Sequence, residues 1–226
     1  MKIVVLNGWA ASPHAWDLCK FASSGDVRIF SYIELLDGVA GKYIERLDEP
    51  FVLVGWSMGG TWALGLAALH SEKVAGLVLV AATPRMMEDK KTDWKGMSER
   101  RLEAFLRGAE MMNGEPLFGV PEGKPNPYMS DKIENLRRGI MFLRDTDLRT
   151  QLEKKKDKFD FPVHIFQSER DGIVKKDNVE WLKRIFPSAK TTIVPGSEHA
   201  LSIMIPGEID EAVDSCVAVA TQSENS

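Results

Sequence analysis

Ser57 lies in the sequence Gly55-Trp56-Ser57-Met58-Gly59, where a run of apolar residues ends and a helix-like pattern begins. The spacing G-x-S-x-G is typical of a sharp turn between a strand and a helix, which lifts a serine hydroxyl clear of the backbone. Glycines on both sides allow neighbouring backbone to approach such a turn closely. The serine is either part of a structural turn or a nucleophile, and the elements around it favour a nucleophile.

A serine hydroxyl becomes a good nucleophile only when a base accepts its proton, and the chain has four histidines. His199 directly follows a strand-like run, and parallel strands share the edge at which their carboxyl ends lie, so His199 is expected near Ser57. His164 lies inside a strand-like run, His70 at the end of a helix pattern, and His14 in the first loop, where it could line a site. We therefore expect His199 to be the base.

A carboxylate must hold the tautomer of the base, and Asp171 follows another strand-like run at the same edge. The resulting chain order of serine, aspartate and histidine is the one that G-x-S-x-G hydrolases use. Glu169 and Asp177 are rival carboxylates, and Asp171 is also compatible with a simple Asp-Gly turn. We prefer Asp171 because the apolar residues Ile173 and Val174 follow it and would bury its contact with the histidine.

Attack on an acyl carbon also requires hydrogen-bond donors for the oxyanion that forms. The backbone N–H of Met58, directly after the serine, is one expected donor. Trp9 is the expected second donor, since Gly8 lets the loop after the first strand turn inward. Without the other groups, this loop would be an ordinary turn with a core tryptophan. The chemistry requires no metal and no organic cofactor.

Short β-branched runs alternate with longer helical patterns along most of the chain. Runs that are apolar on both faces indicate buried parallel strands, and the alternation predicts an α/β fold. The expected strands are 2–6, 27–30, 51–55, 74–81, 163–167 and 190–194. The expected helices are 15–22, 41–47, 58–70, 178–186 and 206–220.

The alternation stops between residues 84 and 158, where two amphipathic helical patterns at 98–112 and 130–145 replace it. We interpret 84–158 as a helical cap inserted after the strand at 74–81, over one edge of the sheet. The core is then 1–83 together with 159–220, in a single domain, and the polar residues 221–226 are expected to form a flexible tail.

Composition narrows the classes of partner. The 226 residues carry a net charge of −4, which does not favour binding to nucleic acid or to an anionic membrane surface. The run at 1–6 is too short for a signal peptide or a membrane span. Cys19 and Cys216 are expected as reduced core thiols, which favours a cytoplasmic location. We expect a monomer.

These features resemble the α/β-hydrolase superfamily over nearly the whole chain. Within it, the segments 7–17, 55–84 and 142–149 look most like the pimeloyl-acyl-carrier-protein methyl ester esterases of biotin synthesis. The resemblance implies a helical cap, catalytic roles for Ser57, Asp171 and His199, and contacts of Trp9 and Met58 with the acyl carbonyl. It also matches Phe105 to a cap residue of the substrate channel.

The chain departs from that family at two positions. Asn7 stands where a histidine is common before the glycine of the oxyanion loop, and Ala109 stands where a glutamine follows the channel phenylalanine. Further apolar residues of the cap would line an acyl channel or belong to an ordinary core: Leu106, Met111, Met112, Leu136 and Phe142.

The charge of the insertion indicates which kind of substrate or partner protein it would attract. Residues 84–158 hold 17 Lys and Arg against 14 Asp and Glu, a net charge of +3, so the remainder carries −7. An acidic acyl-carrier protein or a carboxylate-bearing substrate would be attracted there, although a solvated cap of mixed charge fits equally well. The candidate contacts are Arg100, Arg101, Arg107, Arg137 and Arg138.

The sequence therefore predicts a serine carboxylesterase that acts on an acyl ester, on a carrier protein or free. A thioesterase or a carbon–carbon bond hydrolase on the same scaffold is an alternative. A non-catalytic binding module that kept the fold is another.

Overall fold

The computed structural model describes residues 1–24, 26–114, 119–196 and 198–224. Its centre is a six-stranded sheet in the order β2-β1-β3-β4-β5-β6, in which every pairing of neighbours is parallel. The strands are β1 (Lys2–Leu6), β2 (Val27–Phe30), β3 (Phe51–Trp56), β4 (Val74–Val80), β5 (Val163–Ser168) and β6 (Lys190–Val194). The six predicted strands and the α/β fold are thus confirmed.

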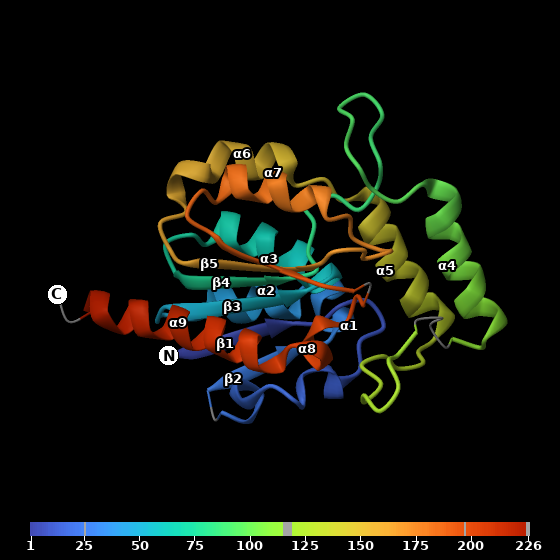
Figure 1. Ribbon diagram of the computed structural model, residues 1–226. Helices are drawn as coiled ribbons and strands as arrows, with labels where there is room; N and C mark the ends of the chain where they lie inside the picture. The colour runs from blue at the N-terminus through green and yellow to red at the C-terminus, as the bar shows by residue number, and fades with distance from the viewer. Residues whose placement is uncertain (25, 115–118, 197, 225–226) are drawn as a thin grey trace.

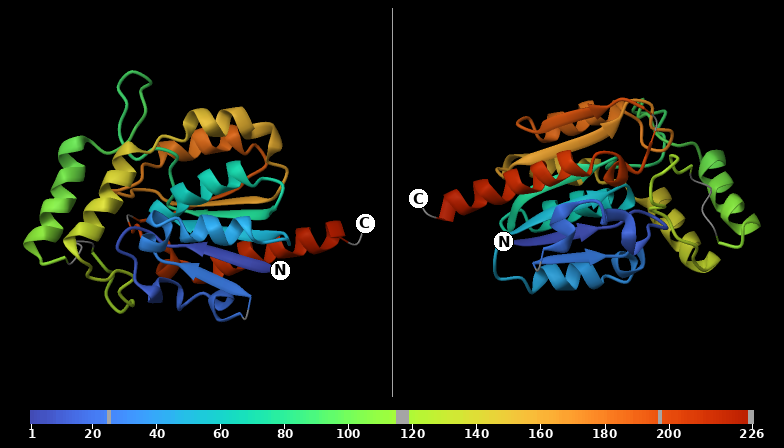
Figure 2. Two further views of the ribbon diagram at one scale, coloured as in Figure 1. Left: turned by 180° about the vertical axis from the view of Figure 1, so that it is seen from behind. Right: turned by 60° about the horizontal axis from the view of Figure 1, so that its bottom comes forward.

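Helices cover both faces of the sheet (Figures 1 and 2). One face packs against α2 (Val39–Glu45), α3 (Met58–Leu69), α6 (Arg149–Lys155) and α7 (Asp177–Ile185). The other face packs against α8 (Leu201–Met204), α9 (Pro206–Glu224) and two 3-10 helices at Pro13–Trp16 and Lys20–Ser23. A further short helix, α1 (Tyr32–Leu36), follows β2. Because both faces are covered, β3 and β5 are buried at every residue.

The predicted continuous helix at 15–22 is wrong, since this segment forms two separate 3-10 turns. The reason is a long-range contact, in which the backbone N–H groups of Lys20 and Phe21 donate to the carboxylate of Asp210 in α9 (3.0 and 3.1 Å). Donors used in this way cannot continue an α-helical ladder. The predicted flexible tail is helical through residue 224, and residues 225 and 226 lie outside the described residues.

The insertion between β4 and β5 divides into two parts. Helices α4 (Glu99–Met111) and α5 (Ile133–Asp145) pack on each other beyond the carboxyl ends of the strands (Figures 1 and 2). Helix α6 instead packs beside α3, so its residues belong to a layer of the core although the cap was expected to run to residue 158. Apolar residues of α4 and α5 share a third core cluster with Trp9 and Met58. The two helices therefore rest directly on the loops at the edge of the sheet.

None of the helices within the described ranges combines the length and the apolar character that crossing a membrane requires.

Candidate active site

Ser57 occupies a strained turn between β3 and α3. Its backbone has φ 55° and ψ −119°, a conformation that residues with a side chain rarely adopt. The surroundings hold it there, since its N–H donates to the carbonyl of Val80 (2.9 Å) and its carbonyl accepts from the N–H of Thr61 (3.1 Å). Gly59 permits this geometry, because a Cβ on it would lie 2.0 Å from the carbonyl oxygen of Leu6. The turn presents the hydroxyl at the edge of the sheet.

His199 lies in the loop between β6 and α8, and its imidazole links the serine to the aspartate. Its Nε2 is 2.7 Å from Ser57 Oγ, and its Nδ1 is 2.8 Å from Asp171 Oδ2. The indole N–H of Trp56 donates to the backbone carbonyl of His199 (3.0 Å), which ties this loop to the end of β3. The three side chains expected to meet at this edge are therefore in hydrogen-bond contact.

Asp171 is a fully buried carboxylate with a complete set of donors. Its Oδ1 accepts from the backbone N–H groups of Ile173 (2.7 Å) and Val174 (3.2 Å), and its Oδ2 from Gln167 Nε2 (3.2 Å) as well as from His199. Burial acts to raise the pKa of Asp171, but His199 and the two backbone donors outweigh it and hold the pKa below its ordinary value. The carboxylate is therefore ionised at neutral pH.

The rival carboxylates lie elsewhere. Glu169 forms a surface pair with Arg170 (3.7 Å), and Asp177 begins α7. His14 is exposed and pairs with Asp17 (2.9 Å), so it does not line the site. His164 is buried within β5, and His70 ends α3.

Trp9 and Met58, the expected oxyanion donors, both lie beside Ser57. A Cβ on Gly8 would be 3.2 Å from the Cβ of Ser57, so the loop before Trp9 passes against the serine. Met58 is the first residue of α3, where backbone N–H groups have no partner inside the helix and can bind a negative charge. Asn7, at the position of the family's histidine, accepts from the indole N–H of Trp16 (2.7 Å). Asn7 therefore links the loop that contains Trp9 to Trp16.

A narrow cavity of about 30 Å³ adjoins Ser57 and His199, with room for about one or two water molecules. Phe105 lines it, as expected, together with Trp9, Met86, Met97, Leu102, Tyr128, Ile140, Leu143 and Ile173. The other channel candidates do not line it. Met111 and Met112 are exposed, and Leu136 is fully buried. Phe142 stacks on Trp62 with ring centroids 4.9 Å apart. Leu106 and Ala109 also lie outside the lining. A substrate therefore requires the lining side chains to move.

An open groove of about 420 Å³ lies on the other side of His199, lined among others by Asp171, Gly172 and Glu198. Tyr128, Ile173 and His199 line both the groove and the narrow cavity. Tyr128 comes from the loop before α5, where the sequence has no helix or strand pattern to place it. Its contribution was therefore not predicted.

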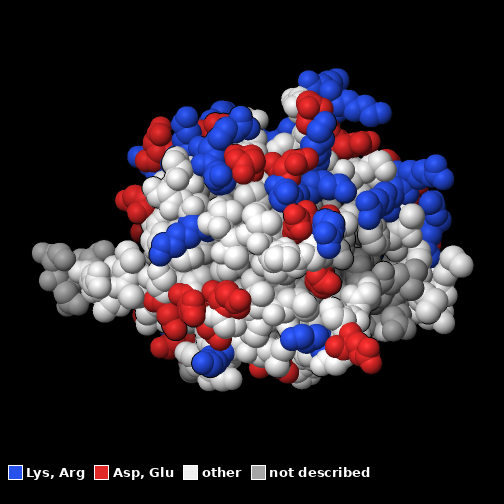
Figure 3. Space-filling view, viewed as in Figure 1, with Lys and Arg blue, Asp and Glu red and all other residues white. Residues whose placement is uncertain are grey.

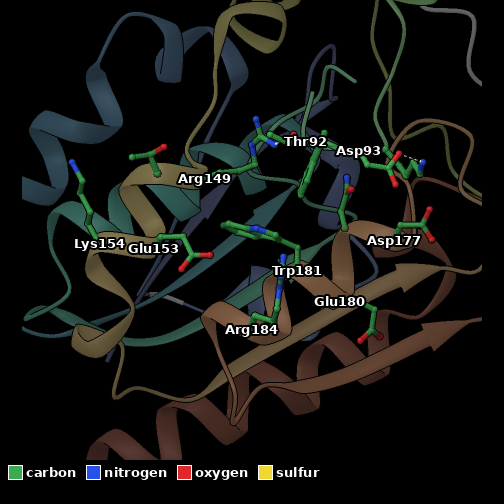
Figure 4. Close-up of a pocket in the computed structure, with 13 residues that line it drawn as sticks. Thr92, Asp93, Arg149, Glu153, Lys154, Asp177, Glu180, Trp181 and Arg184 are labelled. Carbon is green, nitrogen blue, oxygen red and sulfur yellow. Dashed lines mark hydrogen bonds and ion pairs between the residues drawn. The ribbon is translucent and has the colours of Figure 1, made fainter. Parts of the chain in front are cut away.

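A larger cavity, of about 950 Å³, lies between α6, α7 and the loop around Trp94 (Figure 4). Arg149, Trp181 and Arg184 line it, but Ser57, Asp171 and His199 do not. The reactive groups are thus at the smaller cavity.

Of the five candidate arginines, three are engaged within the chain. Arg107 pairs with Glu103 (3.3 Å), Arg137 with Glu110 (2.7 Å) and Arg138 with Asp37 (2.5 Å). Arg100 and Arg101 are exposed, and the guanidinium of Arg101 lies 3.3 Å from where a Cβ on Gly172 would be, beside the open groove. Figure 3 shows Lys and Arg side chains gathered along α4 on this face.

No cluster of three or more His, Cys, Asp or Glu side chains suited to a metal ion occurs in the parts of the chain that the structure describes.

The order of elements, with a serine at the turn after β3 and a histidine after the last strand, defines the α/β-hydrolase class. The chain belongs to the family described as serine aminopeptidase, S33, whose family model matches residues 31–203. The solved structures similar to it include an esterase from Exiguobacterium antarcticum, with a TM-score of 0.73 and 18% identity over 98% of this chain and 92% of that one.

Several curated relatives of similar length share one name. The pimeloyl-[acyl-carrier protein] methyl ester esterase of Nitrosomonas europaea is 25% identical over 94% of both chains. That of Edwardsiella ictaluri is 26% identical over 90% of this chain and 88% of its own. The chain is an enzyme of the carboxylic ester hydrolase class, a serine hydrolase with the α/β-hydrolase fold.

Proposed function

We propose that this protein is a serine carboxylesterase in which Ser57 is the nucleophile, His199 the base and Asp171 the group that orients the base. The observation that carries the proposal is the unbroken chain of short hydrogen bonds, 2.7 Å from Ser57 to His199 and 2.8 Å from His199 to Asp171. A buried carboxylate at one imidazole nitrogen and a serine hydroxyl at the other is the arrangement that activates an alcohol for acyl transfer.

In the first half of the reaction, Ser57 Oγ attacks the ester carbonyl carbon and its proton passes to His199 Nε2. The backbone N–H groups of Trp9 and Met58 stabilise the oxyanion, and Asp171 stabilises the imidazolium through Nδ1–H. When the bond between the acyl carbon and the alcohol oxygen breaks, the alcohol leaves with the proton from His199. In the second half, His199 takes a proton from water as the water attacks the acyl-enzyme, and it returns that proton to Ser57 Oγ when the acid is released.

We propose a methyl ester on a carrier-bound dicarboxylate as the substrate, as in biotin synthesis. Two observations support it. The curated relatives named for this activity match almost the full length of both chains. The insertion is basic within an acidic protein, and the exposed Arg101 lies beside Gly172, which lines the groove at His199.

A thioesterase is the second candidate, because a thioesterase domain from the curacin pathway shares this fold with a TM-score of 0.54. The test uses a methyl pimeloyl-carrier conjugate, in which hydrolysis of the terminal methyl ester and of the thioester to the carrier is followed separately, together with short p-nitrophenyl esters. We expect the highest kcat/KM for the methyl ester and rescue of a biotin auxotroph that lacks its own esterase. A preference for thioesters, with no rescue, contradicts the proposed substrate and leaves the serine chemistry intact.

A further inference from the structure

We propose that helix α5 positions the oxyanion loop, and that it acts through two groups, the indole N–H of Trp9 and the missing side chain of Gly139. This inference rests on the proposed function, in which the backbone N–H groups of Trp9 and Met58 receive the oxyanion. It gives the insertion a role in the chemical step in addition to covering the site.

The first observation is a buried hydrogen bond between the loop and the helix. The indole Nε1–H of Trp9 donates to the backbone carbonyl of Leu136 in α5 (2.8 Å), and Trp9 is only 6% exposed. A buried donor that loses its acceptor is costly, so the indole and α5 hold each other in one arrangement. The backbone of Trp9 is joined to this ring through Cβ, so the anchored ring restricts where the backbone can lie.

The second observation is the contact made by Gly139. A Cβ on this residue would lie 2.4 Å from Trp9 Cδ1, 2.9 Å from Trp9 Nε1 and 3.6 Å from Met58 Sδ. Glycine is unfavourable in the interior of a helix, and here it is what allows α5 to touch the tryptophan ring at this distance. One residue of the insertion therefore meets the side chains of both proposed oxyanion donors.

Helix α5 is also held by contacts with residues of α1 and its end, so it can serve as a fixed reference. The hydroxyl of Tyr32 in α1 donates to Asp131, just before α5 begins. Arg138, next to Gly139, pairs with Asp37 after α1 (2.5 Å). The oxyanion loop is thus held between Ser57 on one side and an anchored helix on the other.

An oxyanion donor is effective only when it is already aimed at the place where negative charge develops. A displacement of about 1 Å in such a group costs on the order of 100-fold in rate. A methyl group at Gly139 must push the Trp9 ring away by roughly that amount to reach ordinary van der Waals contact. We therefore expect Gly139→Ala to lower kcat by about 10- to 100-fold with KM changed less than about threefold.

Trp9→Phe tests the same coupling without adding an atom. This substitution removes the N–H that donates to the carbonyl of Leu136 and keeps an aromatic ring. It is expected to lower kcat by about 10-fold. Each variant has a matched control. Gly41→Ala adds a methyl in helix α2, where nothing lies within 4 Å. Trp94→Phe removes an indole N–H that also donates to a backbone carbonyl, that of Arg85 (3.0 Å), away from the site.

The experiment measures kcat and KM on a p-nitrophenyl ester, the melting temperature, and the affinity for a trifluoromethyl ketone. Such a ketone adds to the serine and leaves an oxyanion in the same place as the reaction does. We expect its affinity to fall in parallel with kcat/KM in Gly139→Ala and Trp9→Phe, and to stay unchanged in both controls. A merely structural role would lower the melting temperature and leave the kcat and ketone affinity of the folded protein unchanged.

Ser57→Ala separates the two proposals. If Ser57→Ala keeps full activity, the proposed function fails. If Ser57→Ala is inactive while folded Gly139→Ala and Trp9→Phe keep kcat within twofold of the wild type, the positioning role of α5 alone is overturned. If Gly139→Ala does not fold, Trp9→Phe decides in the same way.

Discussion

Replacing Asp171 by asparagine exchanges one carboxylate oxygen for an NH₂ group and should nearly abolish activity. The backbone N–H groups of Ile173 and Val174 both donate to Oδ1, so the asparagine keeps its carbonyl oxygen there. Its NH₂ group then takes the place of Oδ2, 2.8 Å from His199 Nδ1. An NH₂ group donates, so Nδ1 becomes an acceptor and the ring proton moves to Nε2. The nitrogen that faces Ser57 can then no longer accept its proton.

The magnitude follows from this tautomer. Loss of the correct tautomer in a serine–histidine–aspartate site costs about 10⁴-fold in kcat, which is about 5.4 kcal/mol of transition-state stabilisation. The assay is the steady-state hydrolysis of a p-nitrophenyl ester by Asp171→Asn, with circular dichroism to confirm folding. Asp177→Asn is the control, since Asp177 is a carboxylate at the start of α7 that lines neither cavity at His199, and it should keep kcat within about twofold of the wild type.

The reasoning is refuted if folded Asp171→Asn keeps more than about one tenth of the wild-type kcat. That result would mean that the hydrogen bond from His199 to Asp171 does not set the tautomer of the base.

Three further results are expected. Gly59→Ala should lower the free energy of unfolding by about 4 kcal/mol or more, because its Cβ would lie 2.0 Å from a backbone oxygen, whereas Gly41→Ala should leave thermal unfolding nearly unchanged. Folding lowers the pKa of Asp171, so its charge stabilises the native state above about pH 4. This contribution is lost as the pH falls through the folded-state pKa. The free energies of unfolding of the wild type and Asp171→Asn, measured by urea titration, should therefore converge at acid pH. Burial raises the pKa values of Cys19 and Cys216 to about 12, so neither thiol should react with a disulfide reagent at pH 8 until the chain is unfolded, and rapid labelling of the native protein would contradict their burial.

The sheet could be predicted from the sequence because its inner strands β1, β3, β4 and β5 carry mostly apolar runs and are almost fully buried. The meeting of Ser57, Asp171 and His199 could be predicted for a related reason. The three residues lie one, three and five positions beyond the ends of β3, β5 and β6, and the carboxyl ends of parallel strands lie along one edge. Local patterns and the rules of parallel sheets were sufficient for both.

The lining of the cavity could not be predicted in the same way. Met86, Met97 and Tyr128 come from irregular segments whose paths depend on contacts far away in the sequence, such as the bridge between Ala11 and Tyr128. Helical spacing also did not distinguish the residues of the insertion that line the cavity from those that are exposed to solvent. It grouped Phe105, which faces the cavity, with Met111, which is 82% exposed.

The arginines show a further limit of the sequence. Arg137 and Arg138 were candidates for a carrier protein, but each finds an acidic partner on another helix or loop, Glu110 and Asp37. The acidic partners lie 27 and 101 residues away in the chain, so no local pattern indicates them. Arg100 and Arg101 are the exposed candidates that form no ion pair within the described residues.

The most direct test of the account is to treat the protein with a fluorophosphonate, which reacts with an activated serine, and to find the modified residue by mass spectrometry. We expect one label on Ser57, no label in Ser57→Ala, and labelling of His199→Ala slower by about 10³-fold or more. Ser71→Ala, a serine between α3 and β4, should be labelled at the wild-type rate. A wild-type protein that stays unlabelled, or that carries the label on another residue, would contradict the claim that His199 makes Ser57 a nucleophile.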